Sequence, residues 1–430
     1  MNKTTIVAAS LLSCTTAATA QSSLTLFGVV DVGVSHYSAK SDFYNNTASF
    51  VLPPAIAPGG VTKSQTALSN SNVSNSRLGF RGTEDLGGGL AAGFWLEAGT
   101  TPDNGATAIS SFNRRSTVSL SGPFGELRMG RDFTPTFWND SVFSPFSTIG
   151  VGANVVSSVG TSLQVVRGPG SPVAASDNYL RTSNGIGYFL PPNLGGVYGQ
   201  FQYALHENAS QSNLPGSPSR KGRYFGGRLG YAAGPLDVAL AYGESTAADT
   251  TGVNAIGLPT GVNLDEKIKT INLGASYDLG FMKIFGEVSQ VTDRALSAAP
   301  VPVLGSVTLR DSDKYKGGLL GVTVPVGPGL IKAAYSRVKF DNDLGPLATP
   351  LTPRRDASVN KLAIGYEYNL SKRTALYATA ARIRIKDGQN NPAVMGAVTG
   401  GVTCLSTGAG TSGFAPRRST GYDFGIRHAF

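Results

Sequence analysis

The sequence predicts an all-β fold, namely a sixteen-stranded antiparallel transmembrane β-barrel. The first observation is the composition: Gly accounts for 55 of the 430 residues and charged residues for only 15%, which favours strands with little charged surface. The second is that apolar and polar residues alternate with a period of two along most of the chain. The third is that the connections between these segments are short and long in turn, as they are in outer-membrane barrels.

The same composition excludes two other classes of protein. No window holds the roughly 18 consecutive uncharged apolar residues that a membrane-spanning helix requires. The 16 Tyr and 20 Phe, together with the regular alternation, argue against intrinsic disorder.

The first twenty residues have the pattern of a secretory signal peptide. Lys3 is a basic start, Ile6–Leu12 a short apolar core and Ala18–Ala20 an A-x-A cleavage site. The prediction is therefore a signal peptide over 1–20 and a barrel over 21–430. Removing Lys3 lowers the formal charge from +9 to +8, so the solutes of the exported chain are expected to be anionic, and no nucleic-acid partner is expected. The exported chain keeps only Cys404 and can form no internal disulfide.

Alternation predicts each strand in order. Even positions of Leu24–Val34 are apolar, Leu236–Tyr242 alternates against Asp237–Gly243, and Tyr422–Phe430 alternates to the end of the chain. The sixteen predicted strands lie near 23–36, 72–82, 90–98, 112–121, 125–132, 178–189, 197–206, 223–232, 236–244, 267–277, 281–291, 314–324, 330–338, 359–368, 375–385 and 420–430.

The connections set the topology. Short ones such as Glu84–Gly89, Ala233–Pro235 and Asp278–Gly280 carry turn residues, while the long ones are rich in Ser, Asn, Gly and Pro. An even strand count places both termini on the side of the short, periplasmic turns. Because lipid offers no hydrogen-bond partner, the sheet has to close on itself. Apolar side chains then face lipid and polar ones line the interior.

Several segments carry a resemblance to a known family: Ser23–Asp31, Ser76–Leu90, Phe112–Arg115, Ser119–Gly125, Leu370–Tyr377 and Gly425–Phe430. With them the chain resembles, from end to end of its exported part, the general porins of Gram-negative bacteria of the beta-proteobacterial type. The resemblance implies a homotrimer of diffusion channels in the outer membrane, surrounded by lipid and lipopolysaccharide. It also implies that the terminal Phe430 is the signal read by the barrel-assembly machinery.

In the family that the chain resembles, the third outside loop folds into the barrel and narrows it. The corresponding segment, 133–176, has 44 residues, far more than a tight connection needs. The alternative is a loop that stays on the surface.

Successive residues of a strand point to opposite faces, and this parity places five arginines toward the lumen, opposite the loop: Arg77, Arg81, Arg115, Arg128 and Arg181. Neighbouring strands lie about 4.8 Å apart, so these side chains are expected to form a basic ladder at a constriction. Arg keeps its charge at every relevant pH. The alternative for each is a solvated or wall-bridging charge without a role in transport.

The inserted loop departs from the family pattern. Porins of the family usually set carboxylates on this loop against the arginines, whereas 141–176 holds no Asp or Glu and only Arg167. Asp132 and Asp140 lie at the root of the loop instead. The sequence therefore predicts an anion-preferring channel.

Further charges follow from parity. Lys332, Arg382, Arg384 and Arg427 are predicted to face inward, where Asp31, Glu126, Glu287, Glu367 and Asp423 could pair with them. Arg114 and Arg131 fall on the lipid-facing parity, which predicts strand ends or a subunit interface because Arg in mid-bilayer costs roughly 2–4 kcal/mol. Trp95, Tyr188, Phe189, Tyr277 and Phe281 are expected to form an interfacial girdle.

No enzyme, cofactor or metal site is predicted. His36, His206 and His428 lie in separate segments, and Gly408–Gly413 fits G-x-G-x-x-G without a preceding strand or a following helix. The expected permeants are small anionic or neutral solutes. Two alternatives remain: a plugged surface adhesin or structural barrel, and a sugar-preferring channel with an aromatic stripe. That stripe would comprise Phe133, Phe137, Trp138, Phe143 and Phe146.

Overall fold

The computed structural model describes residues 23–44, 59–106, 110–166, 178–207, 220–250, 263–301, 305–343, 356–400 and 413–430. The expected signal peptide, Arg167 and Cys404 lie outside these ranges.

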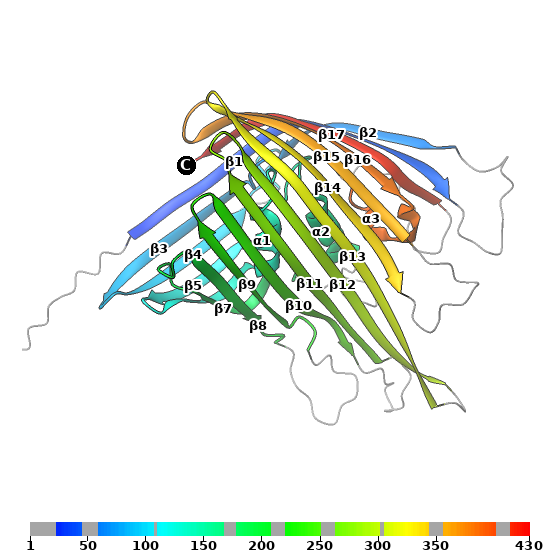
Figure 1. Cartoon of the computed structure of the whole chain (residues 1–430), viewed down its shortest axis with the longest axis horizontal. Helices are drawn as coiled ribbons and strands as arrows, with labels where there is room; N and C mark the ends of the chain where they lie inside the picture. Colours follow the sequence, from blue (N-terminus) through cyan, green and yellow to red (C-terminus); the bar gives the residue numbers. More distant parts are fainter. Residues whose placement is uncertain are drawn as a thin grey trace, which may run out of the picture.

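The described chain forms one closed antiparallel sheet (Figure 1). Each wall strand pairs with the next, and the first pairs with the last, from Val29 opposite Ala429 to Tyr44 opposite Gly413. The strands are β1 (Ser23–Tyr44), β2 (Val61–Asn70), β3 (Arg77–Gly87), β4 (Leu90–Gly99), β5 (Arg115–Gly122), β6 (Gly125–Phe133), β7 (Arg181–Phe189), β8 (Val197–Ala204), β9 (Tyr224–Ala233), β10 (Leu236–Thr250), β11 (Asn263–Asp278), β12 (Lys283–Val301), β13 (Gly305–Val326), β14 (Gly329–Asp343), β15 (Asp356–Asn369), β16 (Thr374–Lys386) and β17 (Gly413–Ala429).

The wall has sixteen positions because β2 and β3 share one of them. β2 pairs with Val32–Ser41 of β1, and β3 pairs with Ser23–Val29 of the same strand. The single strand expected over 72–82 is therefore wrong in its first part. Between the two strands the Asp31 carboxylate accepts the backbone N–H groups of Val73 (2.8 Å) and Ser74 (2.7 Å), which ties this segment to the inner face of β1.

Several strands run beyond the alternating segments that predicted them. β1 continues to Tyr44 instead of 36, and β13 begins at Gly305 instead of 314. Alternation of apolar and polar residues indicates a strand that has one face against lipid. Beyond the bilayer the outer face meets water instead of lipid, so the backbone pairing continues without that pattern.

The exposure of the side chains confirms the predicted inversion. Leu24 is 71% exposed and Phe424 65%, both on the outer face, whereas Asp31 and Asp423 on the inner face are 0% and 2% exposed. An outward apolar face of this kind is stable only against lipid or another protein.

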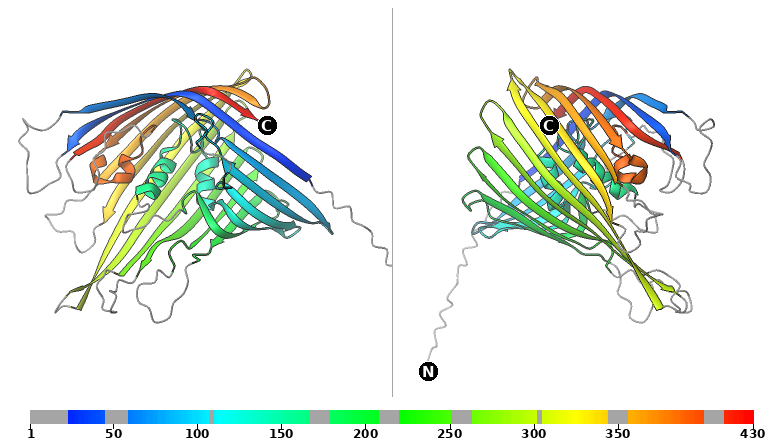
Figure 2. Two further views of the ribbon diagram at one scale, coloured as in Figure 1. Left: turned by 180° about the vertical axis from the view of Figure 1, so that it is seen from behind. Right: turned by 45° about the vertical axis from the view of Figure 1, so that its right-hand side comes forward.

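Residues 134–166 of the connection from β6 to β7 lie inside the barrel, as expected, and contain α1 (Pro135–Val142) and α2 (Val155–Val166) (Figure 2). The Thr134 hydroxyl caps α1 by accepting the N–H of Phe137 at 3.3 Å, and Pro135 occupies the first turn. No helix in the described ranges is long and apolar enough to cross a bilayer.

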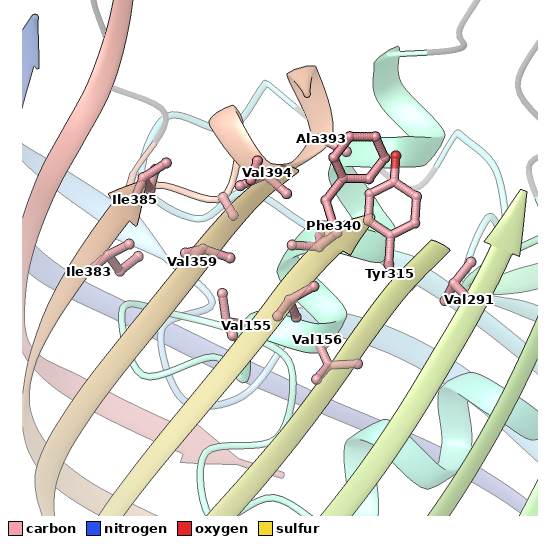
Figure 3. Packing of buried hydrophobic residues seen from close by; sticks show 14 residues of the cluster. Val155, Val156, Val291, Tyr315, Phe340, Val359, Ile383, Ile385, Ala393 and Val394 are labelled. Atoms are coloured by element: carbon pink, nitrogen blue, oxygen red, sulfur yellow. The ribbon is translucent and has the colours of Figure 1, made fainter. Parts of the chain in front are cut away.

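The inserted segment packs against the inner wall through an apolar cluster. Val155 and Val156 of α2 contact a group that includes Val338, Val359 and Ile383 on β14–β16 (Figure 3). Two short elements cover the outer end of the same cluster, the 3₁₀ helix η2 (Gly388–Asn390) and α3 (Pro392–Met395). α2 is thus fixed to the side of β13–β16, whereas α1 packs against β9–β11.

Candidate functional site

A cavity of about 1060 Å³ remains between the inserted loop and the opposite wall. Its charged lining is mostly basic: Arg77, Arg81, Arg114, Arg115, Arg128 and Arg228 line it, with the carboxylates of Glu97 and Asp132. None of the described side chains of α2, at positions 155–162, lines the cavity. The loop therefore leaves open space beside the arginines.

The ring of Trp95 contacts two of the arginines and lies between them. The β3–β4–β5 register sets Arg81, Trp95 and Thr117 side by side on the inner face. The Arg81 guanidinium lies 5.2 Å from the centroid of the Trp95 ring, and that of Arg115 lies 4.4 Å from it. Cation–π contact with one ring holds two like charges in fixed positions.

The two lining carboxylates orient the other arginines. Arg128 donates to Asp132 at 2.7 Å and to both oxygens of Glu126, at 2.8 and 2.9 Å, while its guanidinium stacks on Phe189 at 3.9 Å. Arg115 lies 3.6 Å from the same Asp132 carboxylate. Asp132 is therefore shared between Arg115 and Arg128, whereas Glu126 pairs with Arg128 alone.

Glu97 makes the corresponding contacts for the arginines on the other side of Trp95. Its carboxylate lies 2.5 Å from Arg114 and 3.8 Å from Arg77. Arg114 was expected, like Arg131, at a strand end or a subunit interface; it directly precedes β5, and it lines the cavity because the alternation of that strand does not fix its direction. Arg131, at the end of β6, donates to the backbone oxygen of Asn113 and to Ser183, which agrees with the expected strand-end position.

Arg228 was not singled out from the sequence. It donates to the side chain of Asn139 on α1 and to the Tyr198 hydroxyl at 3.1 Å, and so connects wall and loop. The signal was present, because Leu229 and Tyr231 are outward and place Arg228 inward by parity.

Arg181 is inward but does not line the cavity. Its guanidinium lies 4.2 Å from the centroid of the Phe133 ring, and Phe133 itself forms part of the lining.

Arg382 and Arg384 contradict the prediction that they face the lumen. Both are exposed on the outer face, and Arg382 lies opposite Leu362, which is 60% exposed to the outside. The inner face of β16 carries Ala381 and Ile383 instead, which pack against the interior clusters. The apolar residues of β16 fall on both parities, with Leu376 and Ala380 on one and Ala381 and Ile383 on the other, so alternation alone could not decide its inner face.

The other predicted lumen charges are inward. Lys332 forms an ion pair with Glu367, and Arg427 lies opposite Asp31 in the β1–β17 register. These two cations lie outside the arginine-lined cavity.

Of the five aromatic side chains predicted to form the interfacial girdle, three face outward and two do not. Tyr188, Tyr277 and Phe281 are exposed on the outer face. Trp95 and Phe189 line the cavity, because they lie on the opposite parity.

Most inward carboxylates hold the loop rather than face the cavity. Asp140 of α1 is buried and accepts from Asn272 at 2.6 Å and from the Tyr179 hydroxyl at 2.7 Å. Asp423 accepts the N–H of Val151 at 2.9 Å, and Glu287 accepts from Asn154 at 3.0 Å. Of the two residues expected at the loop root, only Asp132 lines the cavity.

The loop aromatics do not form a continuous stripe. Phe133 and Trp138 line the cavity, whereas Phe137, Phe143 and Phe146 are buried against the wall. Among the described residues, no group of three or more His, Cys, Asp or Glu side chains could hold a metal ion.

Comparison with known proteins agrees with this architecture. A family model described as Gram-negative porin matches residues 4–388. The chain is similar to outer membrane porin protein 32 of Delftia acidovorans, with 35% identity over 429 residues and full coverage of both chains. It is also similar to an outer membrane porin protein of Bordetella pertussis, with 29% identity, covering 88% of this chain and 93% of that protein.

Two solved structures are similar over 95% of the chain. The anion-selective porin from Comamonas acidovorans matches with a TM-score of 0.64 and 32% identity, over its whole length. OmpT of Vibrio cholerae, in a trimer form, has the same fold, with a TM-score of 0.55 and 13% identity over 99% of its chain.

Proposed function

The chain belongs to the Gram-negative porin family, whose members form outer-membrane channels for passive diffusion, and from this premise we propose that its channel prefers anions. The observation that carries the proposal is the unequal use of charge. Six arginines line the cavity with only two carboxylates, while Asp31, Asp140, Glu287 and Asp423 are buried in contacts that anchor the chain. A water-filled passage with fixed positive charge lowers the energy of anions and raises that of cations.

The loop side of the cavity supports the same proposal. The loop contributes Trp138, Ser141, Ser147 and Ile149 to the lining, none of them charged. The field of the arginines is therefore not balanced across the lumen. The similar porin from Comamonas acidovorans is described as anion-selective, which agrees with this arrangement.

The test is the reversal potential of the refolded protein in a planar bilayer under a KCl gradient. We expect a potential on the anion side at neutral pH. Its magnitude should fall at high salt, because mobile ions screen the arginines. A potential on the cation side would overturn the proposal while leaving the channel itself intact.

A homotrimer is the assembly that we propose, in line with the trimer form of the structurally similar OmpT. The broad outward apolar surface would be covered partly by lipid and lipopolysaccharide and partly by neighbouring subunits. Unheated samples should migrate as trimers on a mild detergent gel and as monomers after boiling. Migration as a monomer before heating would contradict the trimer.

Two proposals concern the ends of the chain. We propose that residues 1–20 are removed during export and that the barrel-assembly machinery recognises Phe430. N-terminal sequencing of protein from outer membranes should begin at Gln21. Deletion of Phe430 should lower the amount of barrel in the membrane, and an unchanged amount would contradict its role.

A further inference from the structure

One large aromatic side chain of the inserted loop faces the cavity, that of Trp138 on α1. Its neighbours Phe137 and Asn139 are buried against the wall, whereas Trp138 is 40% exposed. Trp138 and Ser141 lie three residues apart and share the face of the helix that lines the cavity. Because α1 lies inside the barrel (Figure 2), the lipid around the wall does not cover this ring. Its exposed face is therefore open to molecules in the lumen.

Trp138 differs from the other aromatic rings of the cavity in its neighbours. A guanidinium lies over each of five lining rings, those of Phe27, Trp95, Phe133, Phe189 and Tyr198. Within the part of the chain that the structure describes, no cation lies over Trp138, and its ring contact is with Phe133, whose centroid is 5.6 Å away. An indole face without a cation is a surface on which another aromatic ring can stack.

The wall side of the same cavity carries the positive charge. Arg81 is exposed, and its guanidinium lies 5.2 Å from the centroid of the Trp95 ring; that of Arg115 lies 4.4 Å from it. Arg81 has no ion pair with a carboxylate of the described residues. A cation–π contact does not neutralise a guanidinium, so both arginines still attract an anion and can donate hydrogen bonds to it.

The two sides of the cavity therefore offer different chemistry. Beside Trp138 and Ser141, the loop lines the cavity with Ser147 and Ile149, and this side holds no charge. An anion without a ring would use only the wall side, and an uncharged ring only the loop side. A molecule with a planar ring and a negative charge uses both. Sites for small molecules usually combine apolar and aromatic surface with a few polar groups in this way.

We infer that the channel contains a binding site for aromatic carboxylates. The ring of such an anion stacks on Trp138, and its carboxylate is attracted to Arg81 and Arg115. The cavity of about 1060 Å³ has room for a one-ring acid together with water. This inference rests on the proposed anion preference and names the class of organic anion that the cavity retains.

The test compares two carboxylates as blockers of the KCl current through refolded wild-type protein in a planar bilayer. Benzoate and cyclohexanecarboxylate have the same charge at neutral pH and rings of similar size, but only benzoate is aromatic. Benzoate should reach half-block at about fivefold lower concentration, the effect that one stacked aromatic pair gives. Benzamide, which has the ring without the charge, should block far more weakly than benzoate.

Two outcomes with the wild type alone would overturn the inference. Equal block by benzoate and cyclohexanecarboxylate would show that no aromatic ring is recognised. Equal block by benzoate and benzamide would show that the arginines do not hold the carboxylate. Neither result depends on the folding of a variant.

Variants of Trp138 then locate the site. Trp138→Leu keeps an apolar side chain without the ring, so the difference between the two carboxylates should disappear, whereas Trp138→Phe should keep most of it. The matched control is Ile149→Ala, which shortens another uncharged lining side chain of the same loop. It should keep the difference of about fivefold. A Trp138→Leu channel that still prefers benzoate, or an equal loss in the control, would contradict the assignment to Trp138.

The reversal potential in KCl without either carboxylate separates this inference from the proposed function. Trp138 carries no charge, so Trp138→Leu should keep the potential of the wild type. A potential on the anion side together with equal block by the two carboxylates would leave the proposed function intact and overturn only the aromatic site. A potential on the cation side would overturn the proposed function, and with it the assignment of the carboxylate to the arginines.

Discussion

The arginines of the cavity differ in how firmly each is held, and that difference decides what each contributes. Arg128 is bound by Glu126 and Asp132, so its charge is largely balanced locally. Among the described residues Arg81 has no carboxylate partner, and its guanidinium contacts the rings of Phe27 and Trp95 instead. Its charge should act on permeating ions with the least compensation.

At this scale we predict that Arg81→Gln reduces anion preference. A unit charge about 5 Å from a passing anion contributes about 0.8 kcal/mol in water, which corresponds to roughly a fourfold change in relative permeability. Reversal potentials under the same salt gradient measure it. A change of less than about 1.5-fold would show that Arg81 does not set the field.

Glu97→Gln should change the anion preference in the opposite direction. Its carboxylate lies beside Arg77 and Arg114, and neutralising it leaves both charges unbalanced. Anion preference should rise, by a factor similar to the loss in Arg81→Gln. Arg131→Gln serves as the control, because this arginine contacts Asn113 and Ser183 at a strand end and is not among the cavity lining.

At the scale of the element, the inserted loop depends on a few buried polar contacts with the wall. Asp140, Asn139 and Asn272 link α1 to β11 over more than a hundred residues of sequence. Unsatisfied polar groups at such depth would cost about 1–3 kcal/mol each. The contacts therefore select one position for the loop, and with it the width of the channel.

Protonation should modulate this anchoring. Burial raises the pKa of Asp140, more than its hydrogen bonds lower it. A carboxyl group with a raised folded-state pKa stabilises the folded arrangement below its unfolded pKa and loses that contribution as pH rises through the folded value. We predict that brief closures of the open channel become more frequent as pH rises in the wild type.

The variant Asp140→Asn tests whether ionisation of Asp140 causes the pH dependence of the closures. The amide cannot ionise, and its oxygen can still accept from Asn272, so the closure frequency should depend less on pH, the remainder coming from the neighbouring Glu287 carboxyl. Single-channel recordings of both proteins across the same pH series measure this. A wild-type closure frequency independent of pH would contradict a role for Asp140 ionisation.

At the scale of the whole molecule, the barrel is one closed sheet whose first and last strands must meet. Gly28 and Phe430 exchange two backbone hydrogen bonds of 3.1 Å at this seam. The Phe430 ring covers Gly28 so closely that an added Cβ would lie 2.3 Å from it. A side chain at position 28 would displace the Phe430 ring, and its Cβ would also lie 2.9 Å from the backbone oxygen of Arg77.

We predict that Gly28→Val destabilises the closed barrel by about 1–3 kcal/mol, the usual cost of overpacking. The folded fraction after refolding, read from heat-modifiable migration on a gel, should fall. Gly286→Ala is the control, because its added Cβ makes only an ordinary contact. Equal folded fractions for wild type and Gly28→Val would contradict the role of the seam.

The amino-acid sequence by itself determined the wall of this protein. Alternation in segments such as Leu236–Tyr242 and Tyr422–Phe430 reflects a local rule, since neighbouring side chains of a strand point to opposite faces. From it follow the closed antiparallel barrel, the outward apolar face and the inward direction of Arg77, Arg81, Arg115 and Arg128. These outcomes need no knowledge of which residues meet across the lumen.

The tertiary structure alone decided which charges reach the cavity. Asp140 and Glu287 are withdrawn from it, Arg114 joins it, and Arg382 is on the outer face. Each outcome depends on partners far apart in the chain, such as Asn139 with Asn272, or on an inner face chosen by packing against the loop. Local periodicity carries no information about such contacts, because they form only when the sheet has closed around the inserted segment.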